Sequence, residues 1–181
     1  MIYKSYYWKK ELIKLSRKLT KRLTQTNWWT EVQHGTFEKE IMIGFYIIRK
    51  LIEANKLSNE IVSTKIKGFK FPNIGKTIHV MNNHRFYEFF NFDNPKPNNF
   101  NLIFLANQIV HSYLFSPSFD PEDFSLNGIH FSSDKDRNTW LYEISIDTSE
   151  TTIPHSAPWN MMNRKKITEF FKKTNPTILQ T

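Results

Sequence analysis

The sequence predicts a mainly α-helical domain of the α+β class, a helical bundle that carries a small antiparallel β-hairpin or sheet. Three observations favour this class. Leucines recur at helical spacing near the start, an apolar stretch follows between acidic and basic ends, and only short segments alternate polar and apolar residues as strands do. The 181 residues fit a single domain, 1–181, with the hairpin as an insertion at about 128–147.

The first 24 residues predict a helix over about 5–24 with two different faces. Leucines recur every three or four residues and form an apolar face: Leu12, Leu15, Leu19 and Leu23. A second stripe is basic: Lys10, Lys14, Arg17, Lys18 and Lys21. The net charge of +8 and the pI near 9.6 attract polyanions. The basic stripe therefore has two interpretations: it is either a surface that binds phosphates or a solvated charged face.

A loop anchored by Trp28 and Trp29 is expected over 25–36, followed by a second helix. Acidic residues in its first turn and Arg49 and Lys50 in its last suit the helix dipole. Residues 41–48 are apolar on all sides, so this helix is expected in the middle of the fold. Gly44 suggests that a neighbouring element approaches closely.

The remaining elements are short. Residues 65–71 alternate and predict a half-buried edge strand that ends at Pro72, and 82–92 predict a short helix. After a turn at 94–99, a helix capped by Asn98 or Asn99 is expected to run as far as Ser116. Its expected core face is Leu102, Leu105, Ile109 and Tyr113. Segments 129–133 and 140–147 flank 134–138 as a hairpin, and 160–173 predict a last basic helix.

Several protein classes are disfavoured. Without cysteine the chain has no disulfide, no thiolate nucleophile and no cysteine-based zinc site, which favours a reducing cytoplasm. The N-terminus lacks the apolar region of a signal peptide, and the longest apolar stretch, 41–48, is far short of the ~20 residues of a membrane span. The histidines are not spaced as metal ligands, so no metal site is predicted. The sequence also has no glycine-rich phosphate-binding loop, so no cofactor is predicted.

Asn107 and His111 are the main candidates for chemistry. They lie four residues apart, so they share one helix face, next to the apolar stripe. A neutral histidine can take a proton from a ribose 2′-hydroxyl, while an asparagine holds a phosphate or orients the imidazole, which would give metal-independent RNA cleavage. The alternative is a core histidine satisfied by Asn107, Tyr113 or a backbone carbonyl.

The segment 106–111, Ala-Asn-Gln-Ile-Val-His, resembles the signature helix of the HEPN superfamily, helical-bundle proteins of toxin–antitoxin and phage-defence systems. Their ribonuclease members carry Arg, often Asn, three variable residues and His. Asn107 and His111 match, but Ala106 stands at the arginine position. The resemblance implies RNA as the partner, catalytic roles for His111 and Asn107 and a homodimer. Arg49 or Arg85 from another helix would have to replace the missing arginine.

Whether the chain is an enzyme stays open at this point. A HEPN-like protein could cleave RNA or only bind it. Alternatively, the chain is a non-enzymatic interaction protein whose basic first helix contacts nucleic acid and whose hairpin binds a protein partner, or a dimerisation domain. Aromatic residues over 86–92 either stack on bases or belong to the core.

Overall fold

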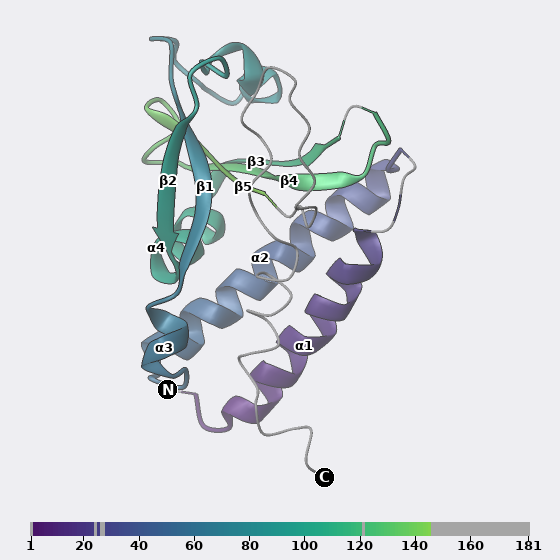
Figure 1. The fold of residues 1–181 in the computed structure, drawn as a ribbon, viewed down its shortest axis with the longest axis vertical. Helices are drawn as coiled ribbons and strands as arrows, with labels where there is room; N and C mark the ends of the chain where they lie inside the picture. The colour runs from purple at the N-terminus through teal and green to yellow at the C-terminus, as the bar shows by residue number, and fades with distance from the viewer. Residues whose placement is uncertain (1, 24, 26–27, 121, 146–181) are drawn as a thin grey trace.

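The computed structural model describes residues 2–23, 25, 28–120 and 122–145, which form three layers (Figure 1). Helix α1 lies beside α2, and α2 and α4 pack on an antiparallel sheet. The elements, in chain order, are α1 (Ser5–Arg22), α2 (Glu31–Glu53), α3 (Asn59–Val62), β1 (Lys65–Pro72), η1 (Asn83–Glu88, a 3-10 helix), β2 (Lys96–Asn101), α4 (Leu102–Val110), β3 (Ser112–Phe119), β4 (Leu126–Ser133) and β5 (Trp140–Ser145).

The sheet corrects the predicted fold class. It has five strands in the order β2-β1-β5-β4-β3, and every neighbouring pair is antiparallel. The chain is therefore an α+β fold, and the prediction of a mainly helical bundle with a small hairpin is wrong. The hairpin of β4 and β5 is confirmed, with Ile129 opposite Ile144. It forms the middle of the sheet, so it is no insertion into a bundle.

Three local predictions fail because tertiary pairing overrides local sequence. β1 lies between β2 and β5, so it is an interior strand and not an edge. β2 has the composition of a turn, with Pro97 and three asparagines, yet it pairs along its length with β1. Helix α4 ends at Val110 and the chain continues as β3, so Tyr113 belongs to a strand. The cap of α4 is Asn101, whose Oδ1 accepts a bond from Phe104 N at 2.7 Å.

Helices α1 and α2 pack side by side through the predicted leucine face. All four leucines are buried, which confirms the orientation of α1. Helix α2 begins at Glu31, inside the expected loop, because Thr30 and Gln33 form a reciprocal capping box. Ile43 and Tyr46 are exposed, so α2 is not enclosed on all sides.

The two faces of the sheet carry separate apolar clusters. The larger cluster joins α1, α2 and α4 to side chains such as Phe100, Phe131 and Tyr142. The smaller one lies on the other face, under the segment between β1 and β2, and contains Phe71, Ile78, Phe89, Phe90, Leu114 and Leu141. The aromatic residues near 86–92 thus contribute to a core. The predicted helix at 160–173 lies outside the described residues, and no helix among those described is long and apolar enough to cross a membrane.

Candidate functional site

The α1 basic face is the set Lys10, Lys14, Arg17, Lys18 and Lys21, and all five side chains are exposed. Lys14 Nζ lies 3.1 Å from Glu11 Oε2, and Lys18 Nζ lies 3.0 Å from Glu40 Oε1. The exposed Lys14–Glu11 pair contributes little and exchanges readily, whereas the Glu40 carboxylate is largely buried and also binds Arg22. Within the described part of the chain, Arg17 has no acidic partner. The face therefore retains a net positive charge.

Tyrosines extend this face at its N-terminal end. Tyr3, Tyr6 and Tyr7 are exposed, and Lys10 Nζ lies 5.9 Å from the ring centroid of Tyr6. Sequence reasoning missed these residues, although a spacing of seven from Tyr7 to Lys14 places both on one side of the helix. Exposed aromatic rings among cations are typical of surfaces that bind single-stranded nucleic acid.

His111 caps the C-terminal end of α4 and is exposed. Its backbone N–H donates to the carbonyl of Asn107 at 3.1 Å, as their spacing predicts, but no hydrogen bond joins the two side chains among the residues described. Arg49 Nη1 lies 2.8 Å from His111 Nε2. Because a guanidinium only donates, Nε2 must be the acceptor and the imidazole is neutral in this contact. Arg85 is instead paired with Glu88 in η1.

Glu53 holds Arg49 in place. It accepts from Arg49 Nε at 2.9 Å and from Lys50 Nζ at 2.8 Å. The hydrogen bond from Lys50, followed by that from Arg49, lowers the pKa of the Glu53 carboxyl below its ordinary value. The carboxylate is therefore ionised at neutral pH and directs the guanidinium toward His111.

The β4–β5 turn lies beside His111. Asp134 N donates to the carbonyl of His111 at 3.2 Å. The turn is fixed to α4 by buried Gln108, whose Nε2 donates to Asp136 Oδ2 at 2.6 Å and whose Oε1 accepts from Ser133 N at 3.0 Å. Arg137, paired with Asp134 at 2.8 Å, adds a second guanidinium to this region. α2, α4 and the turn thus converge on an exposed site of mixed charge.

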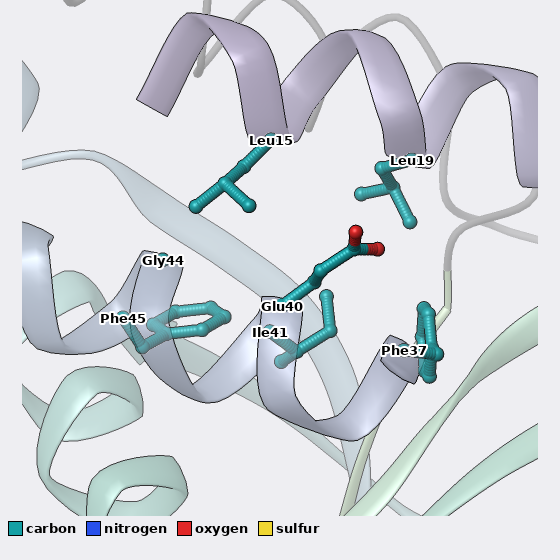
Figure 2. A pocket seen from close by; sticks show the side chains of 7 residues that line it. All are labelled: Leu15, Leu19, Phe37, Glu40, Ile41, Gly44 and Phe45. Atoms are coloured by element: carbon teal, nitrogen blue, oxygen red, sulfur yellow. The ribbon is translucent and has the colours of Figure 1, made fainter. Parts of the chain in front are cut away.

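The described residues line a small hollow and a larger one beside α1 and α2. The first, about 20 Å³, lies between the two helices, where the Glu40 carboxylate points between Leu15 and Leu19 (Figure 2). It has room for about one water, so it is a packing gap. The second, about 670 Å³ and open to solvent, lies where α1 begins and α2 ends. It is lined by Ile2, Trp8, Lys50, Glu53, Ala54, Asn55 and Lys56.

A further pair of titratable groups lies under the second face of the sheet. His130 and Glu143 are cross-strand neighbours on β4 and β5, and their side chains are only 15% and 2% exposed. Nε2 and Oε2 lie 3.7 Å apart, and neither atom has a hydrogen-bond partner among the described residues. Burial lowers the pKa of His130 to about 4 and raises that of Glu143 to about 8. Sequence reasoning missed this pair because strand register is needed to bring the two residues together.

Within the described residues, no group of three or more His, Asp or Glu side chains is arranged to hold a metal ion. No protein-family model, characterised protein or solved structure matches the chain.

Proposed function

We propose that the protein binds RNA through the α1 basic face. The observation that supports this most directly is the division of α1, in which all four leucines are buried while all five predicted cations are exposed. Cations held in this way on a rigid helix match the charge of a phosphate backbone. The leucine face is not free to enter a bilayer, because it packs on α2, and this favours a nucleic acid over a membrane surface.

Binding is tested with a fluorescent RNA in an anisotropy titration at several salt concentrations. Lys14→Glu with Arg17→Glu should weaken binding at least tenfold and lower the salt slope by about two, one for each lost phosphate contact. Lys18 is left unchanged because its partner Glu40 is largely buried and also binds Arg22, so loss of Lys18 would disturb the contact between α1 and α2. The control is Lys65→Glu with Lys67→Glu, a charge change of the same size at two exposed positions on β1. Equal loss in the control would indicate general charge attraction and not this face.

A second candidate function, metal-independent RNA cleavage at His111, is favoured by the contact between Arg49 and His111. When a phosphate replaces the imidazole as the partner of Arg49, Nε2 is free to accept a proton from the 2′-hydroxyl. The 2′-oxygen then attacks the adjacent phosphorus, the bond to the 5′-oxygen breaks, and the imidazolium returns the proton to that oxygen. The products are a 2′,3′-cyclic phosphate and a 5′-hydroxyl. Asn107, one turn before His111, would position the phosphate.

Cleavage is tested on a panel of structured and single-stranded RNAs in EDTA, with wild type and His111→Ala compared at matched thermal stability. Activity in wild type alone would establish the reaction. Absence of cleavage in both folded proteins would leave binding as the function. The HEPN resemblance, a role in toxin–antitoxin or phage-defence systems, a homodimer and a cytoplasmic site of action remain parts of this proposal.

A further inference from the structure

The open hollow between the start of α1 and the end of α2 combines an aromatic wall with cations. Trp8 lines the hollow, and its ring lies 6.5 Å from that of exposed Tyr46. Lys50 and Lys56 also line it, and Lys50 Nζ is 5.7 Å from the Tyr46 centroid. The volume of about 670 Å³ falls within the ~300–1,000 Å³ range of small-molecule sites.

The charge of the hollow favours an anion. The carboxylate among its described lining residues, Glu53, is already bonded to Arg49 and Lys50. In the described part of the chain, Lys56 has no acidic partner. The backbone holds Lys56 firmly, because its N–H donates to Leu51 O at 2.8 Å and Asn55 N–H donates to Ile52 O at 2.9 Å. Asn55 takes the left-handed conformation that ends a helix in this way, with φ of 53°.

A chain of contacts links the hollow to His111. Glu53 lines the hollow and also binds Arg49, which in turn contacts the imidazole. Trp8, which also lines the hollow, belongs to the same helix as Tyr6, Tyr7 and Lys10. The hollow therefore lies between the tyrosine end of the α1 basic face and the Arg49–His111 pair.

We propose that this hollow binds one unpaired nucleotide of a single-stranded RNA, with the base stacked on Trp8 and a phosphate on Lys56. The inference rests on the proposed RNA binding and specifies the strand state of the ligand. A base inside a duplex cannot reach such a wall, because both its faces are stacked on its neighbours. An acidic peptide would satisfy the lysines but not the aromatic wall.

The test is an anisotropy titration with a labelled oligouridylate, the same strand in a duplex, and an abasic strand of equal length. Wild type should bind the single strand most tightly. Lys56→Glu and Trp8→Ala should each weaken that binding by about fivefold or more, the loss of one stacking or phosphate contact, and leave duplex binding unchanged. Lys67→Glu is the matched control. For wild type, the abasic strand should bind more weakly than the oligouridylate.

Each other outcome is decisive. Lys56→Glu guards against the possibility that Trp8→Ala fails to fold, because Lys56 is exposed. If wild type binds no RNA at all, the proposed function itself fails. If wild type binds RNA through the α1 basic face but Lys56→Glu and folded Trp8→Ala behave like wild type, only the nucleotide site is overturned. Competition by polyglutamate as effective as that by RNA would assign the hollow to an acidic peptide instead.

Discussion

The Glu143 carboxyl and the His130 imidazole face each other across β5 and β4, with Oε2 and Nε2 3.7 Å apart and both atoms without a hydrogen-bond partner in the described part of the chain. The rings of Phe71, Phe86 and Phe92 lie around the imidazole, with centroids 5.8–6.2 Å away. In such surroundings a charge on either group is costly, so burial favours a protonated carboxyl and a neutral imidazole. This pair makes folding stability depend on pH.

We expect Glu143→Gln to change the pH dependence of stability. Folding raises the pKa of Glu143 from 4.5 to about 8. The contribution of Glu143 to folding stability is therefore complete below pH 4.5 and is lost as the pH rises toward 8. The variant cannot ionise and should therefore be more stable than wild type at pH 8, by ~1–3 kcal/mol. Urea unfolding at pH values of about 5, 6.5 and 8 measures this. Parallel curves for both proteins would contradict the assignment.

The opposite dependence is expected for His130. Folding lowers the pKa of His130 from 6.5 to about 4. The contribution of His130 to folding stability is therefore complete above pH 6.5 and is lost as the pH falls toward 4. His130→Phe keeps a flat ring in the aromatic surroundings and removes the titration. The variant should lose less stability than wild type between about pH 6.5 and 4, as measured by thermal unfolding. His79→Phe, at an exposed position, serves as the control.

Arg49 variants distinguish a role in chemistry from a role in packing. Arg49→Lys keeps the charge but loses the forked geometry, so any cleavage should fall by ~10²-fold or more while RNA affinity changes little. The matched control is Arg85→Lys, because Arg85 pairs with Glu88 in η1 and not with His111. A cleavage rate that is equal in the Arg49 and Arg85 variants would exclude Arg49 from the site. The readout is single-turnover cleavage in EDTA.

Two glycines should respond oppositely to alanine. In Gly44→Ala the new Cβ would lie 3.8 Å from Leu15 Cδ1, an ordinary contact, and glycine is unfavourable inside a helix. We expect the free energy of unfolding to rise by ~0.5–1 kcal/mol. Because a Cβ fits at Gly44, the close approach inferred there from the sequence is wrong (Figure 2). In Gly68→Ala the Cβ would overlap the Glu143 backbone oxygen, which should cost ~1–3 kcal/mol or more. Denaturant unfolding of both variants checks the signs.

Gln108 should contribute more to folding stability than its neighbour Asn107. Gln108→Leu would leave the Ser133 N–H without its acceptor and Asp136 without its amide donor, at a cost of ~1–3 kcal/mol. Asn107→Leu, exposed on the same helix, should change stability by less than ~0.5 kcal/mol. Equal effects in thermal unfolding would show that the network does not fix the turn. In a cleaving enzyme, Gln108→Leu should also lower the rate by displacing the turn beside His111.

Elements with strong local patterns were predictable and those made by pairing were not. The leucine face of α1 and the alternation in β5 depend on neighbours in sequence, so periodicity finds them. β2 is a strand because it pairs with β1, and its own proline and asparagines, which are typical of turns, do not predict a strand. The site divides in the same way. The sequence suggested His111 with Arg49 as one of two possible arginines, while the choice between Arg49 and Arg85, and the pair His130 and Glu143, required tertiary structure.

The strand order has a consequence for synthesis on the ribosome. β5 is the last described strand to be made, yet it lies in the middle of the sheet, between β1 and β4. Until residues 140–145 have left the exit tunnel, β1 with β2 and β4 with β3 can exist only as separate hairpin-like pairs with open edges. The nascent chain should therefore depend on chaperones until this segment joins the two halves, and a stop codon just before Trp140 should give an aggregating fragment.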